Sequence, residues 1–280
     1  MIKNKRILVS GGAGSVGSEL VRQLARINKI FIIDQNETET FNLREELKAK
    51  GCWVHSRTGD IRDKETIIDV FEDFKPQYVF HSAALKHVTP NEEYPLEVIQ
   101  TNIIGTYNIM MEAKKWECLE KFVFISSDKS VNSSSIMGIS KRMGEVMVCN
   151  QGTKFITVRF GNVLGSRGSV IPIWQRQIDE GMPITITDEK MMRYFMTIED
   201  ACELVIKAAE EGKGGEIFIL DMGKPINIFN LARDIVLKSG RDIPIEIIGK
   251  RPGETLEEKL MTEEEEKRAI RKGKFFIIKR

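Results

Sequence analysis

Three glycines that follow a short apolar run constrain the fold of this chain more than any other feature. Gly11, Gly14 and Gly17 recur every three residues, between the run at 7–9 and a helical pattern that begins near residue 15. Glycine permits a tight turn and lets the backbone and the helix N-terminus approach a pyrophosphate. The pattern predicts a dinucleotide-binding turn between a strand and a helix. The residues expected at the dinucleotide are Gly11, Gly14, Ser15, Val16 and Gly17.

An aspartate at the end of the next apolar run fits the same site. Asp34 follows the run at 30–33, at the spacing from Gly14 expected for a carboxylate on the adenosine ribose hydroxyls. Its negative charge would repel a 2′-phosphate. The sequence therefore favours NAD over NADP as the cofactor.

Apolar runs and helical patterns alternate along most of the chain. Strand-like runs lie at 7–9, 30–33, 53–54, 78–80, 122–125, 155–158 and 216–220. Helical patterns lie near 15–28, 37–50, 63–74, 96–115, 136–150 and 197–211. This alternation predicts an α/β fold, a doubly wound, Rossmann-like parallel sheet with helices on both faces.

The pattern loosens after residue 165, where glycines and prolines interrupt it. We expect residues 1–165 and 196–222 to form an NAD-binding domain. Residues 166–195 and 223–280 are expected to form a small C-terminal substrate-binding lobe over the carboxyl edge of the sheet. Within this lobe, four glutamates at 263–266 followed by Lys267 and Arg268 predict a solvated helix.

Composition excludes several classes of function. The net charge of +1 argues against a nucleic-acid binder, which would carry a basic field. Four scattered cysteines and three histidines indicate neither a disulfide framework nor a metal site, and they fit a reducing cytoplasm. No apolar run approaches the roughly 20 residues that span a bilayer. We therefore expect a cytoplasmic protein without an integral membrane segment.

A cluster of reactive side chains follows the run at 122–125. Ser127, Asp128 and Lys129 lie in the loop expected at the end of this strand, and Met137 and Lys141 are one helical turn apart. Adjacent acidic and basic groups can transfer protons to and from a substrate. Taken alone, Asp128 and Lys129 would be read as a surface ion pair. The glycine motif upstream and Lys141 downstream favour the chemical interpretation.

These motifs resemble the extended short-chain dehydrogenase/reductases, and within them the UDP-N-acetylglucosamine 4,6-dehydratase-like family of capsular polysaccharide biosynthesis. The run at 127–129 resembles the Thr-Asp-Glu or Thr-Asp-Lys signature of nucleotide-sugar 4,6-dehydratases. Met137 stands where the superfamily normally has the tyrosine of a Tyr-x-x-x-Lys pair, and a thioether cannot carry a proton. The resemblance extends over 81–88, 159–172, 192–200, 220–225 and 251–254.

The sequence departs from that family in three respects. Ser127 replaces the commoner threonine, and Ser133 stands where proline is frequent. The N-terminal membrane region of several relatives is missing, so we expect a soluble version of the catalytic domain alone.

The resemblance implies roles for these residues. Asp128 would protonate the leaving C6 hydroxyl and could also take the C4 hydroxyl proton, while Lys129 would remove the C5 proton. Ser127 would bind near the C4 hydroxyl, Lys141 would hold the nicotinamide ribose, and Met137 would pack beside the nicotinamide and the sugar. Further cofactor contacts are expected from Asp60, Ile61, Ser82, Ala83, Ala84 and Asn102.

A second group of polar residues suits a nucleotide sugar. The planar guanidinium fork of arginine binds a diphosphate well, and Glu254 could accept hydrogen bonds from the uridine ribose. Any single arginine could equally be a surface charge or an ion pair between the domain and the lobe. The expected substrate residues are Lys86, His87, Asn162, Ser166, Arg167, Arg193, Arg251 and Glu254.

Three functions are compatible with these features. The first is an NAD-dependent lyase that converts UDP-N-acetylglucosamine to a UDP-4-keto-6-deoxy-N-acetylhexosamine, with C5 retained or inverted, and that acts as a homo-oligomer. The second is a UDP-hexose 4-epimerase, which needs no acid–base pair at C5 and C6. The third is a non-catalytic NAD-binding sensor. Asp128 and Lys129 together favour the dehydratase.

Overall fold

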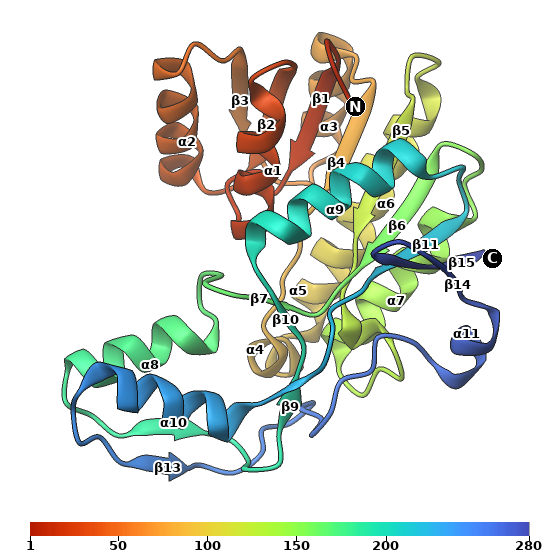
Figure 1. Cartoon of the computed structure of the whole chain (residues 1–280). Coiled ribbons are helices and arrows are strands. Elements are labelled where there is room, and N and C mark those ends of the chain that lie inside the picture. The colour runs from red at the N-terminus through yellow and green to blue at the C-terminus, as the bar shows by residue number, and fades with distance from the viewer. Residues whose placement is uncertain (280) are drawn as a thin grey trace.

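A nine-stranded sheet forms the centre of the molecule in the computed structural model, which describes residues 1–279 (Figure 1). Its order is β14-β15-β11-β6-β5-β4-β1-β2-β3, and the strands from β3 to β11 are parallel. The bounds are β1 Arg6–Ser10, β2 Lys29–Asp34, β3 Val54–Thr58, β4 Tyr78–His81, β5 Lys121–Ile125, β6 Phe155–Arg159, β11 Glu216–Leu220, β14 Ile270–Lys272 and β15 Phe275–Lys279. The predicted parallel α/β sheet is confirmed.

Helices cover both faces of this sheet. One face carries α1, α2 and α9, whose apolar side chains pack in one core cluster with β1, β2 and β6. The other face carries α3, α6 and α7 over β4 and β5. The bounds are α1 Ser15–Ala25, α2 Glu37–Ala49, α3 Lys64–Phe74, α6 Thr106–Lys115, α7 Ile136–Cys149 and α9 Ile198–Glu211. Among residues 1–279, no helix combines the length and apolar character that crossing a bilayer requires.

The segment predicted as one helix near 96–115 is divided. It contains α5 (Pro95–Val98), a π-helical stretch η1 (Ile99–Gly105) and α6, preceded by α4 (Val88–Glu93). Asn102 lies within η1 and binds the backbone of Leu85 from there. Wider helical turns of this kind are frequent at functional sites.

A smaller lobe lies below the carboxyl ends of the parallel strands (Figure 1). It packs α8 (Val170–Asp179) and α10 (Ile228–Ser239) against β8 (Ile184–Ile186) and β13 (Ile245–Ile247). Trp174 is fully buried at the centre of this lobe, and its indole donates to the Thr185 carbonyl. The bounds of the short connecting elements are β7 Asn162–Val163, β9 Met192–Arg193, β10 Phe195–Met196 and β12 Ile226–Asn227.

The end of the chain returns to the main sheet. The lobe was predicted to run to residue 280, but β15 pairs antiparallel with β11, and β14 pairs antiparallel with β15. The reason is apolar burial, because Phe275, Ile277 and Ile278 all lie in the core. Before these strands, α11 (Glu263–Arg268) forms where a solvated helix was predicted from the charges, but its Glu265 is buried.

Candidate active site

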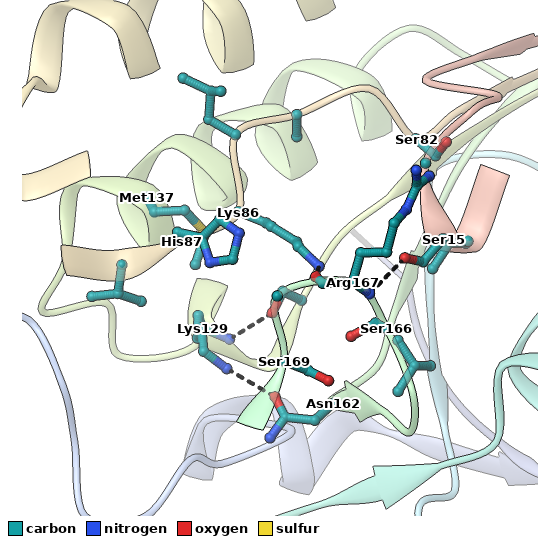
Figure 2. A pocket seen from close by; sticks show the side chains of 18 of the residues that line it. Ser15, Ser82, Lys86, His87, Lys129, Met137, Asn162, Ser166, Arg167 and Ser169 are labelled. Atoms are coloured by element: carbon teal, nitrogen blue, oxygen red, sulfur yellow. Dashed lines mark hydrogen bonds between the residues drawn. The ribbon is translucent and has the colours of Figure 1, made fainter. Parts of the chain in front are cut away.

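A cavity of about 900 Å³ lies between the carboxyl edge of the sheet and the lobe. Figure 2 shows side chains from both sides converging on it. Doubly wound sheets bind ligands at this edge, next to the point where the strand order reverses. Here that reversal falls between β1 and β4.

The glycine turn forms one end of the cavity. Gly11 has a φ of +67°, and a Cβ at this position would lie 2.5 Å from the Ala83 nitrogen. A Cβ on Gly17 would collide with the Gly11 carbonyl, so α1 can pack closely only on glycine. Asp34 lines the cavity beside the turn, and its Oδ2 accepts a hydrogen bond of 3.0 Å from the Ala13 N–H.

Small residues line the cavity after β4. The Ser82 hydroxyl donates to the Ser10 carbonyl at 2.8 Å, which holds this loop against β1. Asn102 does not line the cavity. Its amide instead bonds both backbone groups of Leu85 and the Ser140 hydroxyl, so it fixes the loop from behind.

Asp60 and Ile61 lie in the cavity wall beyond β3. Burial alone would raise the pKa of Asp60, but hydrogen bonds from Arg62 outweigh burial and hold that pKa below its ordinary value. Ile61 packs flat against Gly105, where a Cβ would lie 2.6 Å from the isoleucine side chain. These two residues therefore give the cavity a rigid, partly charged wall.

The predicted catalytic run forms the short turn η2 (Asp128–Ser130) after β5. The Lys129 ammonium lines the cavity and donates to Asp128 Oδ1 at 3.1 Å and to Asn162 Oδ1 at 3.4 Å. Ser127, also in the cavity wall, donates to the same Asp128 oxygen at 2.9 Å.

Asp128 itself is fully buried and does not line the cavity. Its Oδ2 has no hydrogen-bond partner among the described residues and lies 3.0 Å from where a Cβ of Gly161 would be. The carboxylate therefore reaches the cavity only through Ser127 and Lys129.

Helix α7 supports this turn closely. A Cβ on Gly138 would collide with the Lys129 carbonyl, so glycine is what lets the helix and the turn approach. Met137 lines the cavity and is otherwise buried. Lys141 donates to the Ile125 carbonyl at 2.8 Å and lies 4.9 Å from the centre of the Phe124 ring. Burial lowers the pKa of Lys141 to about 8, although the charge of Glu145 opposes the shift.

A buried ion-pair network lies beneath the turn. Glu145 accepts from the Ser126 and Ser130 hydroxyls, both at 2.7 Å, and pairs with Arg159 at 2.7 Å. Arg159 is fully buried and also pairs with Glu265 at 2.8 Å. The two serines flank the predicted catalytic run, so the network holds that run between α7 and α11.

Arg167 lies at the end of the cavity that the glycine turn forms. Its N–H donates to the Ser15 hydroxyl at 3.0 Å, and its guanidinium contacts the Ala13 carbonyl and pairs with Glu39 at 2.8 Å. The Lys86 ammonium donates to the Arg167 carbonyl at 2.7 Å. We predicted Arg167 as a substrate contact, and the structure places it across the glycine turn.

Lys86 and His87 line the same wall. Burial and the neighbouring Arg167 lower the pKa of Lys86, while burial and Lys86 lower the pKa of His87. The imidazole ring lies against Gly168, where a Cβ would be 2.9 Å from Cε1. The lowered pKa therefore favours the neutral form of the His87 ring in the cavity wall.

The remaining predicted substrate residues all line the cavity. Arg193 is buried and donates to the carbonyls of Met192, Thr255 and Leu256, so it anchors the chain near residue 255. Arg251 is exposed, and its backbone N–H donates to the Glu254 carboxylate at 3.0 Å. The other members of this group are Asn162 and Ser166.

One cavity carboxylate is absent from the sequence-based prediction. Glu258 lines the cavity, 3.9 Å from the Lys129 ammonium and 3.8 Å from the Arg193 guanidinium. It belongs to a charged stretch, 257–259, whose composition does not distinguish it from solvated surface. Among residues 1–279, no cluster of three or more histidine, cysteine or acidic side chains is arranged to hold a metal ion.

The sheet order, the glycine turn and the cavity define a short-chain dehydrogenase/reductase fold of the extended type. The X-ray structure of Pen from Bacillus thuringiensis has this fold, with a TM-score of 0.91 and 36% identity, and the match covers 99% of this chain and 88% of that one. A family model described as "Polysaccharide biosynthesis protein" matches residues 7–280. The chain belongs to this polysaccharide biosynthesis protein family, as the resemblance of its motifs implied.

Two further proteins have sequences similar to this chain. Capsular polysaccharide biosynthesis protein CapD of Staphylococcus aureus is 45% identical over 277 residues, which are 94% of this chain but 46% of CapD. The chain therefore spans about half the length of this relative. UDP-glucose 4-epimerase of Rickettsia akari is 33% identical over 291 residues, 99% of this chain and 84% of that enzyme.

Proposed function

We propose that this protein is an NAD-dependent nucleotide-sugar 4,6-dehydratase acting on UDP-N-acetylglucosamine. One observation carries the proposal: Lys129 presents an ammonium to the cavity, bonded to Asp128 and Asn162, while Met137 occupies the usual tyrosine position. An epimerase needs a proton carrier only for the C4 hydroxyl. A group next to the sugar that is separate from the tyrosine position suits elimination at C5 and C6.

The residues at the glycine turn fit NAD. The turn offers a close backbone approach for a pyrophosphate, and Asp34, which lines the cavity beside the turn, would bond the ribose hydroxyls and repel a 2′-phosphate. When bound, NAD would accept a hydride from C4 and return it to C6. Lys141 would bond the nicotinamide ribose from α7.

The protein's own groups would transfer the protons. Ser127 would bond the C4 hydroxyl and pass its proton to Asp128, with which it already shares a hydrogen bond of 2.9 Å. Lys129 and a nearby carboxylate would act as the acid–base pair of the elimination. One of them would remove the C5 proton, and the other would protonate the C6 hydroxyl. The family resemblance gives the base to Lys129 and the acid to Asp128.

The lobe would bind the UDP portion. Arg251 and Glu254 lie on one turn at the cavity, and they would contact the diphosphate and the uridine ribose. Asn162 bonds Lys129, and Lys86 and His87 line the same cavity, so these three residues would contact the sugar.

Mass spectrometry of UDP-sugar reactions tests this proposal. UDP-N-acetylglucosamine incubated with the protein and NAD should lose one water. Lys129→Ala should lower turnover at least about a hundredfold, within the usual contribution of a general acid or base. Lys259→Ala is the matched control, because Lys259 is a nearby exposed lysine outside the cavity wall.

The second candidate is a UDP-hexose 4-epimerase, favoured by the 33% identity with the Rickettsia akari enzyme. An epimerase product has the same mass as its substrate, so the same measurement separates the two reactions. An unchanged sugar, with NAD still bound, would instead indicate a non-catalytic binder.

We also propose that the protein is a homo-oligomer. Exposed apolar side chains gather on the neighbouring helices η1, α6 and α7, and they are Ile99, Ile104, Tyr107, Ile139, Met143 and Val146. Exposed apolar side chains grouped on adjacent helices are typical of a contact with another protein surface. A second copy of the chain is the proposed occupant.

A further inference from the structure

Glu258 faces Lys129 across the cavity. The Glu258 residue is only 7% exposed, yet it lines the cavity, and its Oε1 lies 3.9 Å from the Lys129 ammonium. The two residues come from opposite sides of the site: Lys129 follows β5 of the main sheet, and Glu258 follows the turn at 251–254 that closes the lobe.

The backbone that carries Glu258 is firmly held. Arg193 Nη2 donates to the Thr255 carbonyl at 2.7 Å, and Arg193 Nη1 donates to the Leu256 carbonyl at 3.1 Å. The Met192 N–H also donates to the Leu256 carbonyl, at 2.8 Å. Arg193, expected at a diphosphate, is thus used largely to fix the segment two residues before Glu258, and its guanidinium lies 3.8 Å from that carboxylate.

Two carboxylates lie near Lys129, but only one can touch a sugar. Asp128 is closer, at 3.1 Å, but it is fully buried and outside the cavity wall. Glu258 is farther away and lines the cavity. The cavity therefore holds a carboxylate, a group that can accept a proton, 3.9 Å from an ammonium, a group that can donate one.

We propose that Glu258 is the catalytic base that removes the C5 proton, and that Lys129 is the acid that protonates the C6 hydroxyl. This inference rests on the proposed dehydratase function. The family resemblance makes Lys129 the C5 base, whereas here Lys129 is the acid and Glu258 is the base. The C5 proton and the C6 oxygen are on neighbouring carbons. Two groups 3.9 Å apart can therefore address both.

The proton balance closes within the site. The C5–H bond breaks with its proton passing to Glu258, its electron pair forms the C5–C6 double bond, and the C6–O bond breaks. Lys129 gives a proton to the departing hydroxyl, which leaves as water. When C6 later receives its hydride, Glu258 returns the proton to C5. The C4 hydroxyl proton reaches Lys129 through Ser127 and Asp128, which are linked by hydrogen bonds of 2.9 and 3.1 Å.

Exchange at C5 of the finished product isolates this step. The UDP-4-keto-6-deoxy sugar, made separately, is already a 4-ketone, so its C5 proton can exchange with deuterated water without any hydride transfer. Glu258→Gln should slow the exchange catalysed by the protein at least about a hundredfold. Binding of the UDP-sugar should change much less.

Glu257→Gln is the matched control. Glu257→Gln changes the adjacent, exposed glutamate outside the cavity wall and should exchange at the wild-type rate. Glu258→Asp keeps the carboxylate, serves if the glutamine variant does not fold, and should retain part of the exchange. C5 exchange at the wild-type rate in a folded Glu258→Gln variant would overturn the proposal. So would complete loss of C5 exchange in Glu258→Asp beside full exchange in a folded Glu258→Gln.

The proposed function fails separately. If the unmodified protein releases no water from UDP-N-acetylglucosamine, the dehydratase assignment is wrong whatever Glu258 does. If water is released and Glu258→Gln exchanges C5 normally while Lys129→Ala does not, Lys129 is the base. The dehydratase assignment then stands without the new role for Glu258.

Discussion

At the scale of single residues, Lys141 should give the activity a pH limit on the alkaline side. Burial lowers its pKa from the ordinary value of 10.5 to about 8, so the folded protein loses this ammonium as the pH rises through about 8. If the ammonium holds the nicotinamide ribose, NAD affinity should fall above that pH. Arginine stays charged over this whole pH range. Any NAD binding that Lys141→Arg retains should therefore not weaken above about pH 8. Calorimetric titration of NAD at several pH values measures this affinity. A wild-type affinity that does not change with pH would contradict the role of Lys141 at the nicotinamide ribose.

Met137 should contribute packing and no chemistry. Its side chain is buried against the cavity, and replacement by leucine nearly conserves the volume. Met137→Leu should therefore cost less than about 1.5 kcal/mol of unfolding free energy. Turnover should stay within several-fold of wild type. Collapse of turnover in a folded variant that still binds the UDP-sugar would show that this position has a chemical role.

Sequence reasoning at this scale works best where the backbone itself is constrained. Gly17 is required by its contact with Gly11 in the same turn, and the positive φ of Gly11 favours glycine there, so their spacing reveals the site. Arg167 and Glu258 depend on contacts across more than a hundred positions, with Ser15 and Lys129. No local pattern specifies such contacts, and a charged side chain that reaches a cavity looks the same in a sequence as one that reaches water.

At the scale of elements, the turn that carries Lys129 depends on the buried network beneath it. Glu145→Ala leaves Arg159, which is fully buried, in an ion pair with Glu265 alone. Removing one partner of a buried pair costs about 3–5 kcal/mol. Urea unfolding measures this loss. Glu45→Ala, an exposed glutamate on α2, should stay within about 0.5 kcal/mol of wild type. An equal, small effect of both changes would show that the network does not support the turn.

The helices and strands were predictable to different extents. Parallel strands β1, β5 and β6 are largely apolar runs buried on both faces, and such runs are visible in the sequence. The π-helical stretch around Asn102 was not predictable from the sequence. Its wider turn coincides with hydrogen bonds of the Asn102 side chain with Leu85 and Ser140, which belong to other parts of the chain. Strands β14 and β15 follow the lobe in sequence, and only their pairing with β11 assigns them to the sheet.

At the scale of the whole molecule, the apolar face over α6 and α7 should control assembly. Ile139, Met143 and Val146 recur at helical spacing on α7 and remain exposed in the single chain. Met143→Glu places a charge at the centre of this face and should shift the protein toward the monomer, because burying an unpaired carboxylate is costly. Leu237→Glu, on the exposed side of α10 in the lobe, is the matched control and should leave the mass unchanged. Sedimentation equilibrium over a range of concentrations measures both variants beside wild type. A monomeric wild-type protein, or a Met143→Glu variant of unchanged mass, would rule out this face as the contact between copies.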